Sequence, residues 1–111
     1  MTVNARMPES LASSTGTITV DLGRIAANWL ALADKVAPAR CAAVVKADAY
    51  GLGAERVIAA LTRAGCTTFF IATPDEAETA RKIAPSAEIF ALDGLVGNAA
   101  APFAHLGVKP V

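Results

Sequence analysis

The chain has 111 residues, enough for one small domain with a sizeable core and too few for two. Ten basic and ten acidic residues cancel, so the composition excludes the basic patch of a nucleic-acid-binding protein and a polybasic membrane-binding patch. No apolar run reaches the roughly 18 residues of a membrane span. Residues 1–16 lack the apolar core of a signal peptide, so we expect a disordered polar tail there and a cytoplasmic protein.

The residues most often used as metal ligands are sparse. Cys41 and Cys66 lie in apolar stretches and form no CxxC pair, so we expect buried, reduced thiols. His105 is the single histidine and has no partner nearby in the sequence, which favours a surface position. We therefore expect no metal site.

The first ordered segments are a β-branched strand over residues 17–20 and a helix that begins after Asp21. Aspartate has a side chain suited to capping a helix. Apolar residues follow at helical spacing from Leu22 to Val36, which predicts one buried face. Pro38 ends this helix, because a proline disfavours helical backbone at the residue before it.

From residue 41 onward, apolar strands alternate with helices. The apolar runs are continuous, as in strands that are buried on both faces. We predict strands over residues 41–45, 67–72, 88–92 and 108–111, and helices over residues 54–64, 74–84 and 99–105. The alternation predicts an α/β fold of βαβ units with a parallel sheet and no domain boundary after residue 16.

The helix over residues 74–84 begins with a capping signature. Thr73-Pro74-Asp75-Glu76 has the spacing of a capping box, with proline at the first helical position. The helix dipole favours acidic side chains in this first turn, which accounts for Asp75, Glu76 and Glu78 without catalysis.

Lys46 directly follows the strand over residues 41–45, where α/β folds keep their functional sites. Apolar neighbours would desolvate the ammonium and favour the neutral amine, which can form a Schiff base with an aldehyde such as pyridoxal phosphate. Tyr50 offers a hydroxyl that could reach a phosphate, and Gly51 and Gly53 allow a tight turn. Position alone leaves an alternative open, in which Lys46 is solvated and Tyr50 only packs.

The glycine pair does not fit a nucleotide-binding motif. A dinucleotide fingerprint needs a third glycine at position 56, which is Arg56, and no Gly-Lys-Ser/Thr sequence is present for a P-loop.

The segment from Ala43 to Gly53 resembles the cofactor-lysine signature of alanine racemases, A-V-V-K-A-[ND]-A-Y-G-H-G, with Leu52 in place of the usual histidine. The flanking segments are also similar to that family: Thr19-Val20-Asp21-Leu22 resembles its opening strand, Glu76-Ala77 its second barrel unit, and Ile89-Phe90-Ala91-Leu92 the next barrel strand. The similarity covers residues 17–111, which we interpret as part of the N-terminal barrel domain.

The resemblance implies the N-terminal portion of a (β/α)8 TIM-type barrel that binds pyridoxal 5'-phosphate (PLP). It implies that Lys46 is the Schiff-base lysine and the catalytic base on one face of the substrate α-carbon. Tyr50 would contact the cofactor phosphate, and Leu92 would form an apolar wall beside the cofactor. The implied reaction interconverts L-alanine and D-alanine, which supplies D-alanine for peptidoglycan, and the implied assembly is a homodimer.

Length limits what this chain can contain. A barrel of this type takes about 250 residues, so we expect a truncated fragment with an open strand edge and an exposed apolar face. By the resemblance, the second catalytic base is a tyrosine from a later domain that this fragment lacks. Two alternatives stay open: a non-catalytic PLP-binding fragment, and a related barrel racemase for another amino acid such as serine or lysine.

Overall fold

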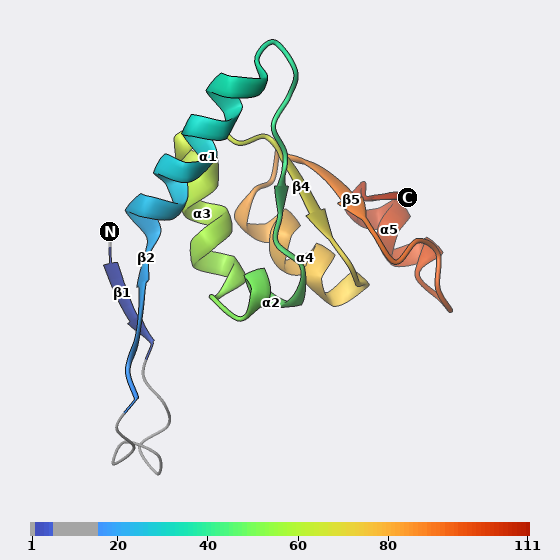
Figure 1. Ribbon diagram of the computed structural model, residues 1–111. Coiled ribbons are helices and arrows are strands. Elements are labelled where there is room, and N and C mark those ends of the chain that lie inside the picture. Colours follow the sequence, from blue (N-terminus) through green and yellow to red (C-terminus); the bar gives the residue numbers. More distant parts are fainter. Residues whose placement is uncertain (1, 6–15) are drawn as a thin grey trace.

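The computed structural model describes residues 2–5 and 16–111 of the chain (Figure 1). None of the helices in these two ranges is long and apolar enough to cross a membrane. The elements in chain order are β1 (Thr2–Ala5), β2 (Ile18–Asp21), α1 (Leu22–Val36), β3 (Ala43–Val44), α2 (Lys46–Tyr50), α3 (Ala54–Ala64), β4 (Thr68–Ile71), α4 (Pro74–Ile83), β5 (Glu88–Ala91), α5 (Ala100–Leu106) and β6 (Lys109–Pro110).

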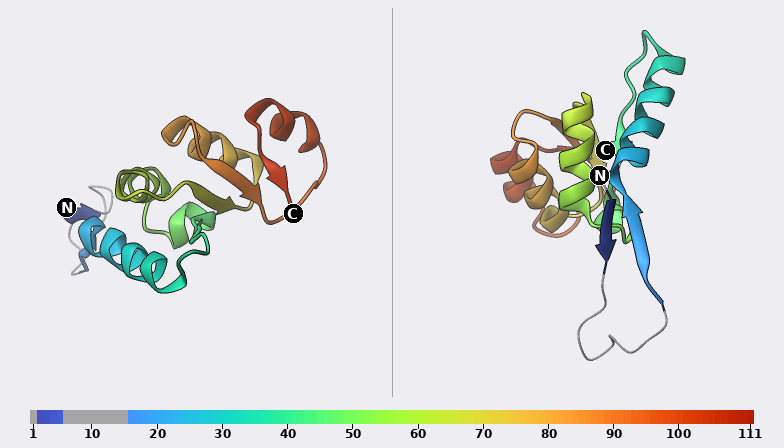
Figure 2. Two further views of the ribbon diagram at one scale, coloured as in Figure 1. Left: turned by 90° about the horizontal axis from the view of Figure 1, so that it is seen from above. Right: turned by 90° about the vertical axis from the view of Figure 1, so that its left-hand side faces the viewer.

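Four strands form a parallel sheet in the order β3-β4-β5-β6. Val44 pairs with Phe70, Phe70 with Phe90, and Phe90 with Lys109. Each strand therefore neighbours the next one along the chain, and the helices α3, α4 and α5 make the crossovers. These three helices lie along one face of the sheet (Figure 2). The predicted α/β fold of βαβ units is confirmed.

The core lies between the sheet and these helices. Phe69 and Ile71 of β4 and Ile89 and Ala91 of β5 are at most 1% exposed, because alternate residues of a strand point to the same face. Val57, Ile58, Leu61, Ala77 and Ala80 of α3 and α4 are buried against them.

The other face of the sheet has no helix of α3–α5 over it. Phe70 and Phe90 lie on this face, where their rings stack with centroids 4.9 Å apart, and both are only half-buried. Val44 is 47% exposed. The expectation that these strands are buried on both faces therefore holds for one face only within this chain.

The start of the chain differs from the expected loose tail. Residues 2–5 form β1, which pairs antiparallel with β2 in a separate two-stranded sheet, with Val3 opposite Val20. The rest of the expected tail, residue 1 and residues 6–15, lies outside the described residues, and Gly16 is exposed.

Helix α1 begins and ends where the sequence predicts, but its apolar face is less buried. Asp21 caps it by accepting a hydrogen bond from the Arg24 backbone N–H at 3.1 Å. Leu22 is buried and Trp29 is half-buried, with its indole N–H donating to the Cys41 carbonyl at 3.2 Å. Because α1 packs mainly on α3, Leu30, Leu32 and Val36 on its other side are 49%, 56% and 43% exposed.

Helices α3 and α4 begin or end at the capping residues that the sequence predicts. Helix α3 spans the predicted residues 54–64, and Gly65 ends it in the left-handed conformation with φ 110°. The capping box of α4 is present, because the Thr73 hydroxyl accepts from the Glu76 N–H at 3.3 Å and the Glu76 carboxylate accepts from the Thr73 N–H at 3.1 Å.

Arg81 forms hydrogen bonds with the end of α4, the segment before β5 and the end of α5, at the amino-terminal side of the sheet. Its guanidinium donates to the Ala87 carbonyl at 2.7 Å, in the approach to β5, and to the Leu106 carbonyl at 2.8 Å, at the end of α5. It also donates to the carbonyls of Ala84, Pro85 and Gly107. These carbonyls terminate helices or lie in turns, so few other donors of this chain reach them.

Replacing Arg81 tests this bracing. We expect Arg81→Lys to lower the free energy of unfolding by about 2 kcal/mol, because an ammonium cannot reproduce the planar fork of donors. Arg63→Lys on α3, an exposed arginine, should change it by less than about 0.5 kcal/mol. Urea unfolding followed by circular dichroism measures both, and equal effects of the two substitutions would contradict the bracing role.

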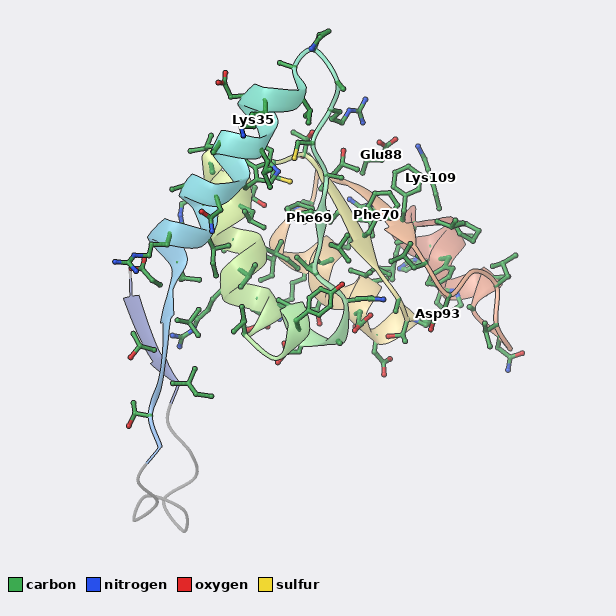
Figure 3. The ribbon with its side chains drawn as sticks, viewed as in Figure 1. Lys35, Phe69, Phe70, Glu88, Asp93 and Lys109 are labelled. Carbon is green, nitrogen blue, oxygen red and sulfur yellow. The ribbon has the colours of Figure 1, made fainter. Side chains whose placement is uncertain are left out.

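Glu88 holds two cations on the open face of the sheet. Its carboxylate accepts from Arg40 at 2.6 Å and from Lys109 at 2.6 Å, and the Lys109 ammonium lies 5.5 Å from the centre of the Phe90 ring. Figure 3 shows Glu88 and Lys109 at the opposite end of the sheet from Asp93, which follows β5. The hydrogen bond from Lys109 is the largest cause that holds the pKa of the Glu88 carboxyl below its ordinary value of 4.5.

The lowered pKa makes the contribution of Glu88 depend on pH. This contribution is present above the ordinary pKa of 4.5 and is lost as the pH falls through the lowered value. We therefore expect Glu88→Gln to lower the free energy of unfolding at about pH 7 and to lower it by less at about pH 3. Urea titrations at both pH values check this, with exposed Glu78→Gln as the control. A deficit of equal size at both pH values would contradict it.

Candidate active site

Lys46 lies at the carboxyl end of β3, as the sequence predicts. The preceding residue, Val45, is 2% exposed, and its N–H donates to the Phe70 carbonyl at 2.9 Å. Lys46 itself is half-buried. Within the described part of the chain its amine makes no hydrogen bond or ion pair, so it is available to react with a ligand.

A turn of left-handed helix follows the lysine. Ala47, Asp48, Ala49 and Tyr50 have φ angles of 52°, 55°, 55° and 57°. For residues with a Cβ this conformation costs roughly 1–2 kcal/mol each. The sequence predicts only a loop here, and a run of ordinary side chains gives no signal for four consecutive left-handed residues.

Several hydrogen bonds hold this turn, α2, in place. The Ala49 N–H donates to the Val45 carbonyl at 3.0 Å, and the Gly51 N–H donates to the Ala47 carbonyl at 2.9 Å. The Asp48 carboxylate accepts from the Ala54 N–H at 2.8 Å and so caps α3. Ala49 is 4% exposed and anchors the turn in the core.

Glu76 contacts the turn from the next βα unit. One oxygen of its carboxylate accepts from the N–H groups of Ala72 at 2.7 Å and Thr73 at 3.1 Å. The other oxygen accepts from the Ala47 N–H at 2.5 Å, directly after Lys46. Sequence reasoning assigned Glu76 to helix capping alone. The parallel pairing of β3 and β4 was the signal that the two segments would meet.

Tyr50 and Leu92 lie at the same end of the sheet as Lys46, but the structure does not bring them together. Tyr50 ends the left-handed turn and is 64% exposed. Leu92 follows β5 and is 39% exposed, and its N–H donates to the Ile71 carbonyl at 2.7 Å. Among residues 16–111, no hydrogen bond or ion pair links Lys46 or Tyr50 to another side chain. The arrangement is an open edge that can receive a ligand.

A cavity of about 230 Å³ lies behind the turn. Its walls come from the segment around Lys46, from the first turns of α3 and α4, and from the end of β4. The lining residues are Val45, Asp48, Ala54, Ile58, Ile71, Asp75, Glu76 and Thr79. No group of three or more histidine, cysteine or carboxylate side chains within the described ranges is arranged to hold a metal ion.

The cysteines and the histidine lie away from this site. Cys66 is 2% exposed, its thiol donates to the Thr68 carbonyl at 3.4 Å, and burial raises the pKa of the thiol. Cys41 is half-buried, less than expected, and both thiols are free. His105 lies exposed on α5, as predicted.

The parallel βα units, with Lys46 directly after β3, form part of a β/α barrel, and barrels of this type keep their sites at the carboxyl ends of the strands. Residues 20–111 match the family model described as alanine racemase, N-terminal domain. The chain therefore belongs to this family.

Individual relatives agree with this assignment. An alanine racemase from Methylobacterium sp. (strain 4-46) is 49% identical over 94 residues, which are 85% of this chain and 26% of that protein. A crystal structure of alanine racemase from Bartonella henselae with covalently bound pyridoxal phosphate is 43% identical with a TM-score of 0.79, covering 82% of this chain and 26% of that one. An alanine racemase structure from E. faecalis is 28% identical with a TM-score of 0.72, covering 82% and 25%. The chain spans about a quarter of the length of these relatives, and its fold matches the N-terminal barrel portion.

Glycine substitution tests the left-handed turn. We expect Ala47→Gly to raise the free energy of unfolding by about 0.5–1 kcal/mol, because glycine adopts positive φ without steric cost. The same change in exposed Ala27, within right-handed α1, should lower it by about 1 kcal/mol. Urea unfolding measures both effects, and a loss of stability in Ala47→Gly as large as in Ala27→Gly would contradict the left-handed backbone.

Proposed function

We propose that this chain is the cofactor-lysine segment of an alanine racemase and that Lys46 holds PLP covalently. The observation that carries the proposal is the position of half-buried Lys46 at the carboxyl end of β3, beside a firmly held turn, with an amine that makes no hydrogen bond or ion pair among residues 16–111. Family membership and the PLP-bound relative from Bartonella henselae support it.

The residues at this edge fit the cofactor. Lys46 supplies a primary amine that can condense with an aldehyde. The exposed hydroxyl of Tyr50 is available to donate to a phosphate, and a side chain added at Gly51 or Gly53 would meet nothing within 4 Å, so the turn leaves open space beside it. Leu92, also exposed, offers an apolar surface for a planar ring.

PLP, when bound, stabilises negative charge at the α-carbon of an amino acid. The contribution of this chain is to hold and move a proton at the Lys46 Nζ, on one face of that carbon. The carboxylates of Glu76 and Asp48 accept backbone N–H groups of the turn and its neighbours, so they fix the path of the chain around the lysine. Leu92 would exclude water beside the reacting carbon.

We further propose that the whole enzyme is a cytoplasmic homodimer that interconverts L-alanine and D-alanine and thereby supplies D-alanine for peptidoglycan. The second base, on the opposite face of the α-carbon, comes from outside the 111 residues. Because the chain spans 26% of its Methylobacterium relative, we propose that these residues by themselves bind the cofactor without racemising alanine. We also propose that the residues that select the amino-acid substrate lie in the part of the enzyme that these 111 residues do not include.

Reductive labelling tests the cofactor site. Incubation of the chain with PLP, followed by borohydride and peptide mapping, should give an adduct mainly at Lys46, because its amine makes no hydrogen bond or ion pair among residues 16–111 and lies beside the turn that we propose binds the phosphate. Lys46→Arg should abolish this adduct, while exposed Lys82→Arg should leave it unchanged. An even spread of label over all lysines would contradict the site, and racemisation of alanine by the chain alone would contradict the non-catalytic role.

A further inference from the structure

The two oxygens of the Glu76 carboxylate contact different parts of the fold. Oε1 accepts from the N–H groups of Ala72 and Thr73, which belong to the second βα unit. Oε2 accepts from the N–H of Ala47 in the first unit, 29 positions away in the sequence. A capping box needs only the first of these contacts. Helix capping therefore does not explain the bond to Ala47.

The bond to Ala47 meets a need of the left-handed turn. Inside the turn, the N–H groups of Ala49 and Gly51 find backbone carbonyls of Val45 and Ala47. The Ala47 N–H precedes these pairs, and the first N–H groups of any helix lack a partner within that helix. Glu76 supplies this partner with a charged acceptor, and such hydrogen bonds are about twice as strong as neutral ones.

The position of this bond gives it a functional consequence. Ala47 is the residue after Lys46, and Tyr50 ends the same four-residue turn. Ala47 is itself exposed, so core packing does not fix its backbone. Glu76 is half-buried at the start of α4, which packs in the core through Ala77 and Ala80, so its carboxylate is held by a rigid element.

We propose that Glu76 is a positioning residue of the cofactor site: its carboxylate fixes the left-handed turn and thereby sets the place of the Lys46 amine and the Tyr50 hydroxyl. This inference rests on the proposed role of Lys46 in holding PLP. Glu76 itself touches neither the cofactor nor the substrate. Its effect passes through the backbone of Ala47.

Two substitutions separate positioning from capping. Glu76→Gln keeps one carbonyl oxygen for the N–H groups of Ala72 and Thr73 but turns an amide N–H₂ toward the Ala47 N–H, so two donors face each other. Thr73→Ala removes the hydroxyl that accepts from the Glu76 N–H and leaves the bond to Ala47 intact. Both substitutions therefore weaken the capping box, but only Glu76→Gln removes the contact to the Ala47 N–H.

Three measurements on the full chain read out the difference. We expect Glu76→Gln to speed hydrogen exchange at the Ala47 amide by about 10- to 100-fold and to slow PLP labelling of Lys46 by about tenfold, the effect of losing one charge-assisted hydrogen bond. The strong intraresidue HN–Hα NOEs that positive φ gives at residues 47–50 should weaken. Thr73→Ala should leave the labelling rate and these NOEs unchanged, although it also lowers the urea midpoint.

The outcomes distinguish this inference from the proposed function. If the unsubstituted chain gives no adduct at Lys46, the proposed cofactor role fails. If that chain labels at Lys46 and Glu76→Gln preserves the Ala47 exchange rate and the NOEs, the positioning role is overturned. It is also overturned if Glu76→Gln and Thr73→Ala slow labelling equally, because the loss would then follow stability alone.

Discussion

The parallel pairing of β3 with β4 and of β4 with β5 determines where the candidate functional residues of this chain lie. Val44, Phe70 and Phe90 are in register across the three strands, so the segments that follow them emerge at one edge of the sheet. Lys46, the start of α4 and Leu92 therefore all lie at this edge, although they are far apart in the sequence. A shift of one strand by one residue would turn its side chains to the opposite face and separate them.

The same register divides the sheet into two chemically different faces. The helix-covered face is apolar and closely packed, with Phe69, Ile71 and Ile89 at most 1% exposed. The open face carries the Glu88 ion network at the amino ends and the stacked rings of Phe70 and Phe90 in the middle. In a barrel the equivalent face points inward and is filled in layers by side chains of several strands. Membership of the alanine racemase family explains why the apolar side chains of Phe70 and Phe90 lie on a face that this chain leaves open.

The sequence was sufficient for features that depend on local chemistry. Gly65 and the Thr73–Glu76 capping box mark helix ends by backbone conformation and side-chain hydrogen bonds within a few residues, and both were predicted. The position of Lys46 followed from the apolar run before it. The left-handed turn could not be predicted, because the contacts that stabilise it come from Glu76, 29 residues after Ala47, and from core burial of Ala49. The exposure of Leu30 likewise depends on which elements pack against α1. The helical spacing of apolar residues predicts an apolar face but not the element that covers it.

The left-handed turn and Glu76 together fix the backbone around Lys46. The proposed role of Lys46 needs a fixed backbone at the end of β3, and a loop with glycines at positions 51 and 53 would by itself be mobile in water. The chain instead adopts a conformation that is unfavourable for each of four residues and stabilises it through contacts from neighbouring elements. Since one of these contacts comes from α4, the geometry around Lys46 forms only when the first two βα units pack together. The site is therefore a product of the parallel sheet rather than of the signature segment alone.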